Sequence, residues 1–162
     1  VIFARNQDSY DYLKKVQQDG LFWKFYEVRT AYPAEFLEGF PQYCFSDPAS
    51  GNAVISSYFR SYGRKGSSVR PVTDSSRFHS GRVYSTEVHA IGQDRFLCML
   101  NRGFRHQIRC HMAWSGHPVA GDEQYGAPAS PEPFGLEAVG VSFPGKDGHE
   151  VSFGTTFQHR IR

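Results

Sequence analysis

The chain has 162 residues, which is enough for one domain with a core of its own and too few for two comfortable ones. Apolar residues make up 40% and aromatic residues 15% of the sequence, as in a folded globular protein, and no apolar run approaches the roughly eighteen residues of a membrane span. The formal net charge of +2 at pH 7 does not by itself indicate a partner.

The distribution of charge and of cysteine is more informative than their totals. Segment 60–82 has a single acid, Asp74, against six basic residues: Arg60, Arg64, Lys65, Arg70, Arg77 and Arg82. Such polarity suits a polyanion on one face, although a solvated basic loop explains it equally well. The cysteines are odd in number and form no CxxC pair: Cys44, Cys98 and Cys110. We therefore expect reduced thiols, no disulfide framework, no membrane segment and a cytoplasmic location.

The first predicted element is a helix over residues 5–20. Asn6 or Asp8 can cap its start, and Gly20 is placed to end it. Between them, apolar side chains recur at the spacing that puts them on one face of a helix.

The second predicted element is an aromatic-rich strand over residues 21–32, closed by Pro33. Successive side chains of a strand point to opposite faces. Lys24, Tyr26 and Val28 therefore share one face, and the other face carries Trp23, Phe25 and Glu27.

From Phe40 to Gly81 the pattern is weaker and rich in turn-forming residues, with one short predicted strand over residues 53–59. We expect this segment to be the most mobile part of the chain.

The last eighty residues predict two hairpins separated by a helix. Their elements are strands 82–92 and 94–101, a helix over 105–116, and strands 137–143 and 150–157. Together these elements indicate an α+β fold, with a largely antiparallel mixed sheet and flanking helices, in one domain over residues 1–162.

The segment 100–126 carries two closely spaced patterns, H-Q-I-R-x-H and G-x-P-x-x-G-D-x-x-Y-G. They resemble the C-terminal signature of the RluA-like RNA pseudouridine synthases. The residues that match are Leu100, Gly103, His106, Gln107, Ile108, Arg109, His111, Gly116, Pro118, Gly121, Asp122, Tyr125 and Gly126. Segment 1–28, with its K-x-Y, and the closing hairpin also resemble that family, whereas residues 39–82 resemble it least.

Two features depart from the family pattern. The family's T-G-R is replaced by R-G-F at 102–104, so Arg102 or Arg105 would supply the displaced charge. The family's catalytic aspartate lies in a motif R-L-D-x-x-T-S-G shortly before the first strand, and none of the eight aspartates has that context. We therefore expect the chain to be the C-terminal part of a pseudouridine synthase-like catalytic domain whose N-terminal portion is missing, and to be inactive alone.

The resemblance implies roles for individual residues. Arg109 would keep the nucleophilic aspartate ionised and oriented, because a guanidinium within hydrogen-bonding reach stabilises the charged carboxylate. Tyr26 would stack on the uracil and exchange a proton, while Lys24 and Ile108 would complete the pocket. Further predicted substrate contacts are His106, Gln107, Arg102 and Arg105. The aspartate would attack the nucleoside at the sugar or at the base, and an isomerisation implies no metal and no organic cofactor.

Each of these residues also has a purely structural interpretation. Tyr26 could be an ordinary strand aromatic, Lys24 a solvent-facing lysine and Arg109 an exposed partner for an acid. Asp122 is predicted to be a turn and capping residue rather than a general acid.

Three histidines invite a comparison with zinc sites. Spacings of five and six residues put His106, His111 and His117 on different helix faces, and no thiol pair joins them, so no metal site is expected. His106 is expected to hydrogen-bond the backbone at the turn into the helix.

The predicted function is isomerisation of uridine to pseudouridine in structured RNA, either ribosomal or transfer RNA. The target base would leave its stack to enter the pocket. Basic residues of 60–82, with Arg102 and Arg105, would face the RNA. The alternative is a non-catalytic RNA-binding module derived from the same fold.

Overall fold

A computed structural model describes residues 2–31, 37–42, 47–74, 81–129, 131 and 133–154 of the chain. Pro33, Cys44, Arg77 and the last three residues of the predicted strand 150–157 lie outside the described residues.

The described residues form a seven-stranded sheet in the order β3-β2-β4-β5-β1-β6-β7, and all six neighbouring pairs are antiparallel. The strands are β1 (Trp23–Arg29), β2 (Asn52–Tyr62), β3 (Ser68–Val72), β4 (Tyr84–Gly92), β5 (Arg95–Leu100), β6 (Leu136–Pro144) and β7 (Glu150–Gly154). The helices are α1 (Gln7–Gln18) and α2 (Gln107–Trp114), with short 3-10 turns η1 (Pro48–Ser50), η2 (Arg64–Gly66) and η3 (Glu123–Tyr125). The α+β fold with a largely antiparallel sheet is thus confirmed.

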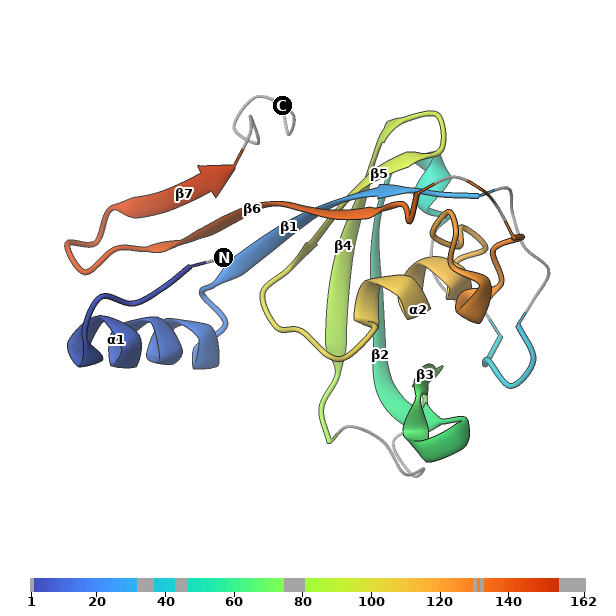
Figure 1. Cartoon of the computed structure of the whole chain (residues 1–162), viewed down its shortest axis with the longest axis horizontal. Helices are drawn as coiled ribbons and strands as arrows, with labels where there is room; N and C mark the ends of the chain where they lie inside the picture. The colour runs from blue at the N-terminus through green and yellow to red at the C-terminus, as the bar shows by residue number, and fades with distance from the viewer. Residues whose placement is uncertain are drawn as a thin grey trace.

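Helix α1 begins and ends as its sequence predicts. The side chain of Asn6 accepts a hydrogen bond of 2.8 Å from the backbone N–H of Ser9, and Gly20 adopts the left-handed conformation, with φ of +75°. Tyr12 donates a hydrogen bond of 2.8 Å to the carbonyl of Pro144. This bond ties α1 to the β6–β7 hairpin, and the two project together from the rest of the molecule (Figure 1).

The prediction for the middle of the chain was wrong in part. The short strand over 53–59 is the centre of the eleven-residue β2, and β3 follows it where no strand was expected. Strand β3 has five residues and includes Pro71, which an edge strand tolerates because one row of its backbone groups has no neighbour.

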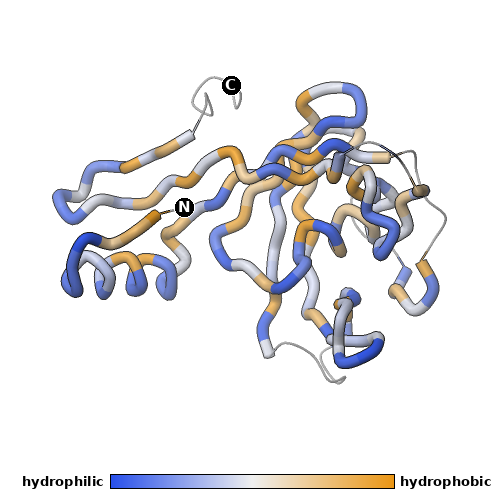
Figure 2. Tube along the Cα trace, viewed as in Figure 1, coloured by the Kyte–Doolittle hydropathy of each residue, from blue (hydrophilic) through white to orange (hydrophobic). Residues whose placement is uncertain are grey.

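The core lies between one face of the sheet and α2, which crosses that face (Figure 1). Seven of the eight residues of α2 are buried, and Arg109 is the exception. Ile108 and Met112 belong to the same buried cluster as Val28 of β1 and Cys98 of β5. Figure 2 shows hydrophobic stretches along the strands and hydrophilic ones at turns such as that between β6 and β7.

Candidate active site

A cavity of about 400 Å³ opens where β1 and β5 meet the start of α2. Strand pairing places Lys24 opposite Leu100 and Tyr26 opposite Cys98, so both side chains stand on the face that α2 covers. The residues that line the cavity are Lys24, Tyr26, Leu100, Gly103, Phe104, His106, Gln107, Ile108, Arg109 and Leu136.

The structure thus brings together residues from opposite ends of the chain. Tyr26 and Arg109, the two predicted catalytic residues, line the same cavity, as do four of the six predicted substrate contacts. Tyr26 is half-buried, and this burial raises the pKa of its phenol.

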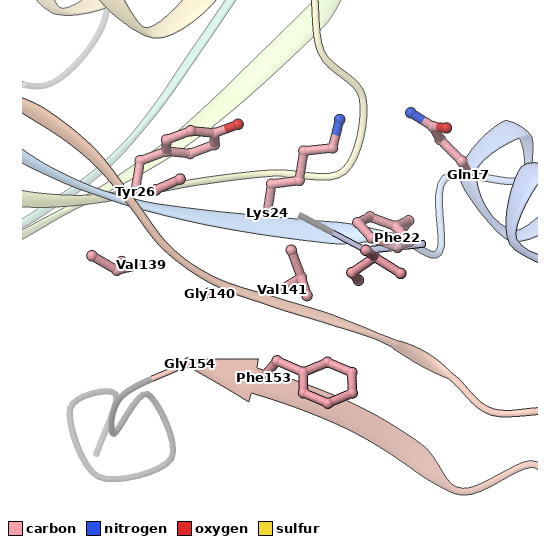
Figure 3. A pocket seen from close by; sticks show the side chains of 11 residues that line it. Gln17, Phe22, Lys24, Tyr26, Val139, Gly140, Val141, Phe153 and Gly154 are labelled. Carbon is pink, nitrogen blue, oxygen red and sulfur yellow. The ribbon is translucent and has the colours of Figure 1, made fainter. Parts of the chain in front are cut away.

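A second cavity of about 710 Å³ lies beyond β1, bounded by α1 and the β6–β7 hairpin. Lys24 and Tyr26 line both cavities and project to the same side of β1 (Figure 3). Phe22, Val141 and Phe153 make the second cavity largely apolar. The two predicted site residues on β1 therefore stand between a cavity of mixed polar and apolar lining and a largely apolar one.

Arg109 forms a two-pronged ion pair at the edge of the first cavity. Its Nε and Nη2 donate hydrogen bonds of 2.7 Å each to the two carboxylate oxygens of Asp122, and Nη2 also donates one of 2.8 Å to Gln124. The bond to Asp122 is the main cause that raises the pKa of Arg109. The structural interpretation of Arg109 as the partner of an acid is therefore observed, but Arg109 lines the cavity rather than an open surface and Asp122 is buried.

His106 adopts the left-handed conformation, with φ of +56°, immediately before α2. Its Nδ1 lies 3.1 Å from the hydroxyl of Tyr125, and that hydroxyl accepts a hydrogen bond of 2.9 Å from the N–H of Val69. The Tyr125 hydroxyl therefore bridges the backbone of Val69 and the imidazole of His106. Burial is the main cause that lowers the pKa of His106, and the charges of Arg109 and Arg105 lower it further.

This contact differs from the backbone hydrogen bond expected for His106. The imidazole instead reaches a buried phenol, which links the turn before α2 to β3 and η3.

Gln107 is almost fully buried, and its amide is engaged on both sides. Its Oε1 accepts a hydrogen bond from the N–H of Phe104, and its Nε2 donates to the carbonyl of Ser85 and to Oγ1 of Thr86. These bonds hold the turn before α2 against β4. A substrate contact through the Nε2 donors would require breaking at least one of them.

His111 continues the same buried network. Its Nδ1 lies 2.9 Å from Oγ1 of Thr86, and its Nε2 lies 3.0 Å from Oγ of Ser57. Both hydroxyls can donate or accept, so the neutral imidazole donates to one of them through its N–H and accepts from the other through its second ring nitrogen. Full burial lowers the pKa of His111 to about 3, so the imidazole is neutral.

Arg102 and Arg105 are not among the residues that line the cavity. Nη2 of Arg102 donates to the carbonyl of Gln18 at the end of α1, and Arg105 donates to the carbonyl of Gly66 in the β2–β3 hairpin. The structure thus directs these two predicted substrate contacts to neighbouring elements.

Asp122 is the residue whose contact the sequence did not reveal. It stands at the N-cap position of η3, but its side chain makes no capping hydrogen bond, because both of its oxygens bind Arg109. Its side chain is only 1% exposed. An acid in the G-D-x-x-Y-G pattern was visible, but its distance from Arg109 was not.

The three histidines of the signature region have separate partners, since His117 binds Asp47 through Nε2. Within the described ranges, no three His, Cys, Asp or Glu side chains gather as a metal-binding group. No helix in the same ranges is long and apolar enough to cross a membrane. Cys98 and Cys110 are free and buried.

No family model matches the chain, but similar proteins are found both in sequence and in structure. The chain is 42% identical over 62 residues to the ribosomal large subunit pseudouridine synthase D of Nitrosomonas europaea, a match that covers 38% of this chain and 17% of that protein.

The solved structure of human RNA pseudouridylate synthase domain containing 1 superposes with a TM-score of 0.68 at 18% identity, over 94% of this chain and 62% of that one. For human RNA pseudouridylate synthase domain containing 4, the TM-score is 0.61 at 16% identity, over 93% and 64%. The chain therefore spans less than two thirds of each of these proteins.

Proposed function

Because the chain is related in sequence and fold to the RluA-like pseudouridine synthases, we propose that it forms part of an enzyme that isomerises uridine to pseudouridine in RNA. The observation that carries this proposal is the convergence of Tyr26 and Arg109 on one cavity. A tyrosine from the first strand and an arginine from the signature helix are the two groups that the chemistry needs beside its nucleophile.

The reaction breaks the bond between N1 of uracil and C1′ of ribose and forms a bond between C5 and C1′. C5 loses a proton and N1 gains one, so no electrons or external atoms enter. The half-buried Tyr26 would stack on the uracil and exchange a proton with it, while Ile108 supplies an apolar wall. Lys24 adds a positive charge on the same strand face.

The nucleophile in this proposal is an aspartate outside the 162 residues. The described carboxylate that binds Arg109 is that of Asp122, which is buried and held in a bidentate pair. We propose that Arg109 receives the nucleophilic aspartate on its remaining donor, and that the chain is the C-terminal part of the catalytic domain.

RNA would approach along the β2–β3 hairpin, where Arg64 and Lys65 lie in the turn and Arg60 and Arg70 stand opposite each other on the paired strands. Arg105 joins that hairpin to the start of α2. We propose ribosomal or transfer RNA as the substrate, and the name of the bacterial relative favours RNA of the large ribosomal subunit.

The test is to map pseudouridine in ribosomal and transfer RNA from cells that lack the gene, and then from the same cells given the wild-type or the Arg109→Lys protein. Loss of one or more pseudouridines, restored by the wild type alone, supports the enzyme. An unchanged pseudouridine pattern, together with RNA binding by the purified protein, would instead favour a non-catalytic RNA-binding module.

A further inference from the structure

The ion pair between Arg109 and Asp122 leaves one part of the guanidinium unoccupied. Asp122 accepts hydrogen bonds from Nε and Nη2, and Gln124 accepts another from Nη2. Within the described part of the chain, Nη1 has no hydrogen-bond partner. Since Arg109 lines the cavity, Nη1 is the donor still available to a group that enters it.

The position of the Asp122 carboxylate is itself fixed. The N–H of Asp122 donates to the carbonyl of Val119 at 3.0 Å, and its own carbonyl accepts from the N–H groups of Tyr125 and Ala127. The carboxylate therefore sits on a turn that is hydrogen-bonded on both sides.

Two aromatic rings restrict the guanidinium further. Cζ of Arg109 lies 4.9 Å from the ring centre of Tyr125 and 5.5 Å from that of Phe134. Such contacts favour a particular placement of the cation over each ring. With the two-pronged carboxylate, they define both the position and the rotation of the guanidinium plane.

We propose that Asp122 is a positioning residue that holds Arg109 so that Nη1 faces the cavity. Without Asp122, the Nε–Nη2 edge would keep only the contact of Nη2 with Gln124, and a carboxylate in the cavity would compete for that bidentate edge by rotating the side chain. The nucleophile would then be held in a different place. This role rests on the proposed function, because it matters only if Arg109 orients a reacting group.

The first experiment measures release of tritium from C5 of labelled uridine in RNA by the full-length protein. We compare Asp122→Asn, Arg109→Lys, the double variant and Glu123→Gln, an exposed neighbour that serves as the control. We expect Asp122→Asn to lower kcat about 10- to 100-fold, because small misplacements of a reacting group are that costly. KM for RNA should change by less than about two-fold, because binding of the RNA does not depend on this pair.

The double variant separates positioning from folding. Lysine lacks the planar guanidinium whose two donors bind Asp122, so Asp122→Asn should add little to the effect of Arg109→Lys. Multiplicative effects, or a loss of activity that follows only the fraction of folded protein, would overturn the proposal.

A second measurement does not depend on turnover. In the NMR spectrum of this chain, the Nε–H proton of Arg109 should exchange slowly with solvent, and Asp122→Asn should make it exchange quickly. Arg60, which is exposed, supplies the reference for rapid exchange. Rapid exchange at Arg109 in the wild type would refute the positioning role, whereas slow exchange in this chain together with no pseudouridine formation by the full-length protein would refute only the proposed reaction.

Discussion

Tyr26 is the residue through which the first strand reaches the site. Its side chain lines both cavities and is half-buried. A phenol in this position can stack through its ring and exchange a proton through its oxygen, and one substitution separates these two roles.

Tyr26→Phe keeps the ring and removes the hydroxyl. We expect kcat for pseudouridine formation by the full-length protein to fall about 100-fold or more, as is typical when a proton-transfer group is lost, while RNA affinity and the melting temperature stay nearly unchanged. Tyr10→Phe on the exposed face of α1 is the matched control. Full activity of the Tyr26→Phe protein would rule out the proton-transfer role.

His111 makes stability depend on pH. Its pKa is lowered from 6.5 to about 3 by burial, so between these values the unfolded chain binds a proton that the folded chain does not. The contribution of His111 to the free energy of unfolding is complete above about pH 6.5 and falls by about 1.4 kcal/mol per unit as the pH decreases below it.

His111→Gln should remove this part of the pH dependence. Urea unfolding at several pH values between 4 and 7.5 should show a shallower loss of stability in the variant than in the wild type, even though the variant is less stable at pH 7.5. His149→Gln, at an exposed turn position, is the control. Equal slopes for wild type and His111→Gln would show that the imidazole is not kept neutral by the fold.

At the scale of elements, hydrogen bonds from residues around the site hold the β2–β3 hairpin. Arg105 binds the carbonyl of Gly66, the hydroxyl of Tyr125 accepts from Val69, and the amide of Gln124 donates to Ser68. The basic turn of this hairpin is therefore held beside the cavity wall, where an RNA backbone could meet both.

Replacing Arg64 and Lys65 with glutamine tests this surface. Each phosphate contact that is lost should lower the slope of log Kd against log salt by about 0.7 to 0.9, so the double variant should lower it by about 1.4 to 1.8. The double variant Lys14→Gln and Lys15→Gln removes the same charge from exposed positions of α1 and should leave the slope unchanged. Equal slopes for the two double variants would show that the turn of the hairpin does not contact the RNA.

The same hairpin shows where prediction from sequence fails. Helix α1 and the β4–β5 hairpin carry their signals locally, in caps, alternation and a short turn, and they were predicted within a few residues. Strand β3 is short and contains Pro71, and both faces of it are covered by residues distant in sequence. Its hydrogen bonds come from β2 and from Tyr125, which no local pattern can indicate.

At the scale of the whole molecule, the site depends on strand order. Placing β1 between β5 and β6 brings the first strand of the chain beside the end of β5 and the start of α2. The cavity lies where these three elements meet, and under the proposed function the binding of RNA also uses the β2–β3 hairpin outside it.

The chain alone should therefore bind RNA without isomerising it. We expect the purified 162-residue chain to bind uridine-containing RNA in a salt-dependent manner and to release no tritium from C5 of labelled uridine, because the proposed nucleophile is not among its residues. Isomerisation at the rate of the full-length protein would contradict this prediction, and its source would then have to be sought among the aspartates of the chain.

The sequence by itself determined the class of fold and the position of most elements, because hydrophobic period and caps are local properties, and its motifs of fixed spacing singled out six of the residues that line the cavity. Only the tertiary structure decided which acid Arg109 binds, how the amide of Gln107 is used and what His106 contacts. These are distances between groups far apart along the chain, and they follow from strand order and from the way α2 packs on the sheet.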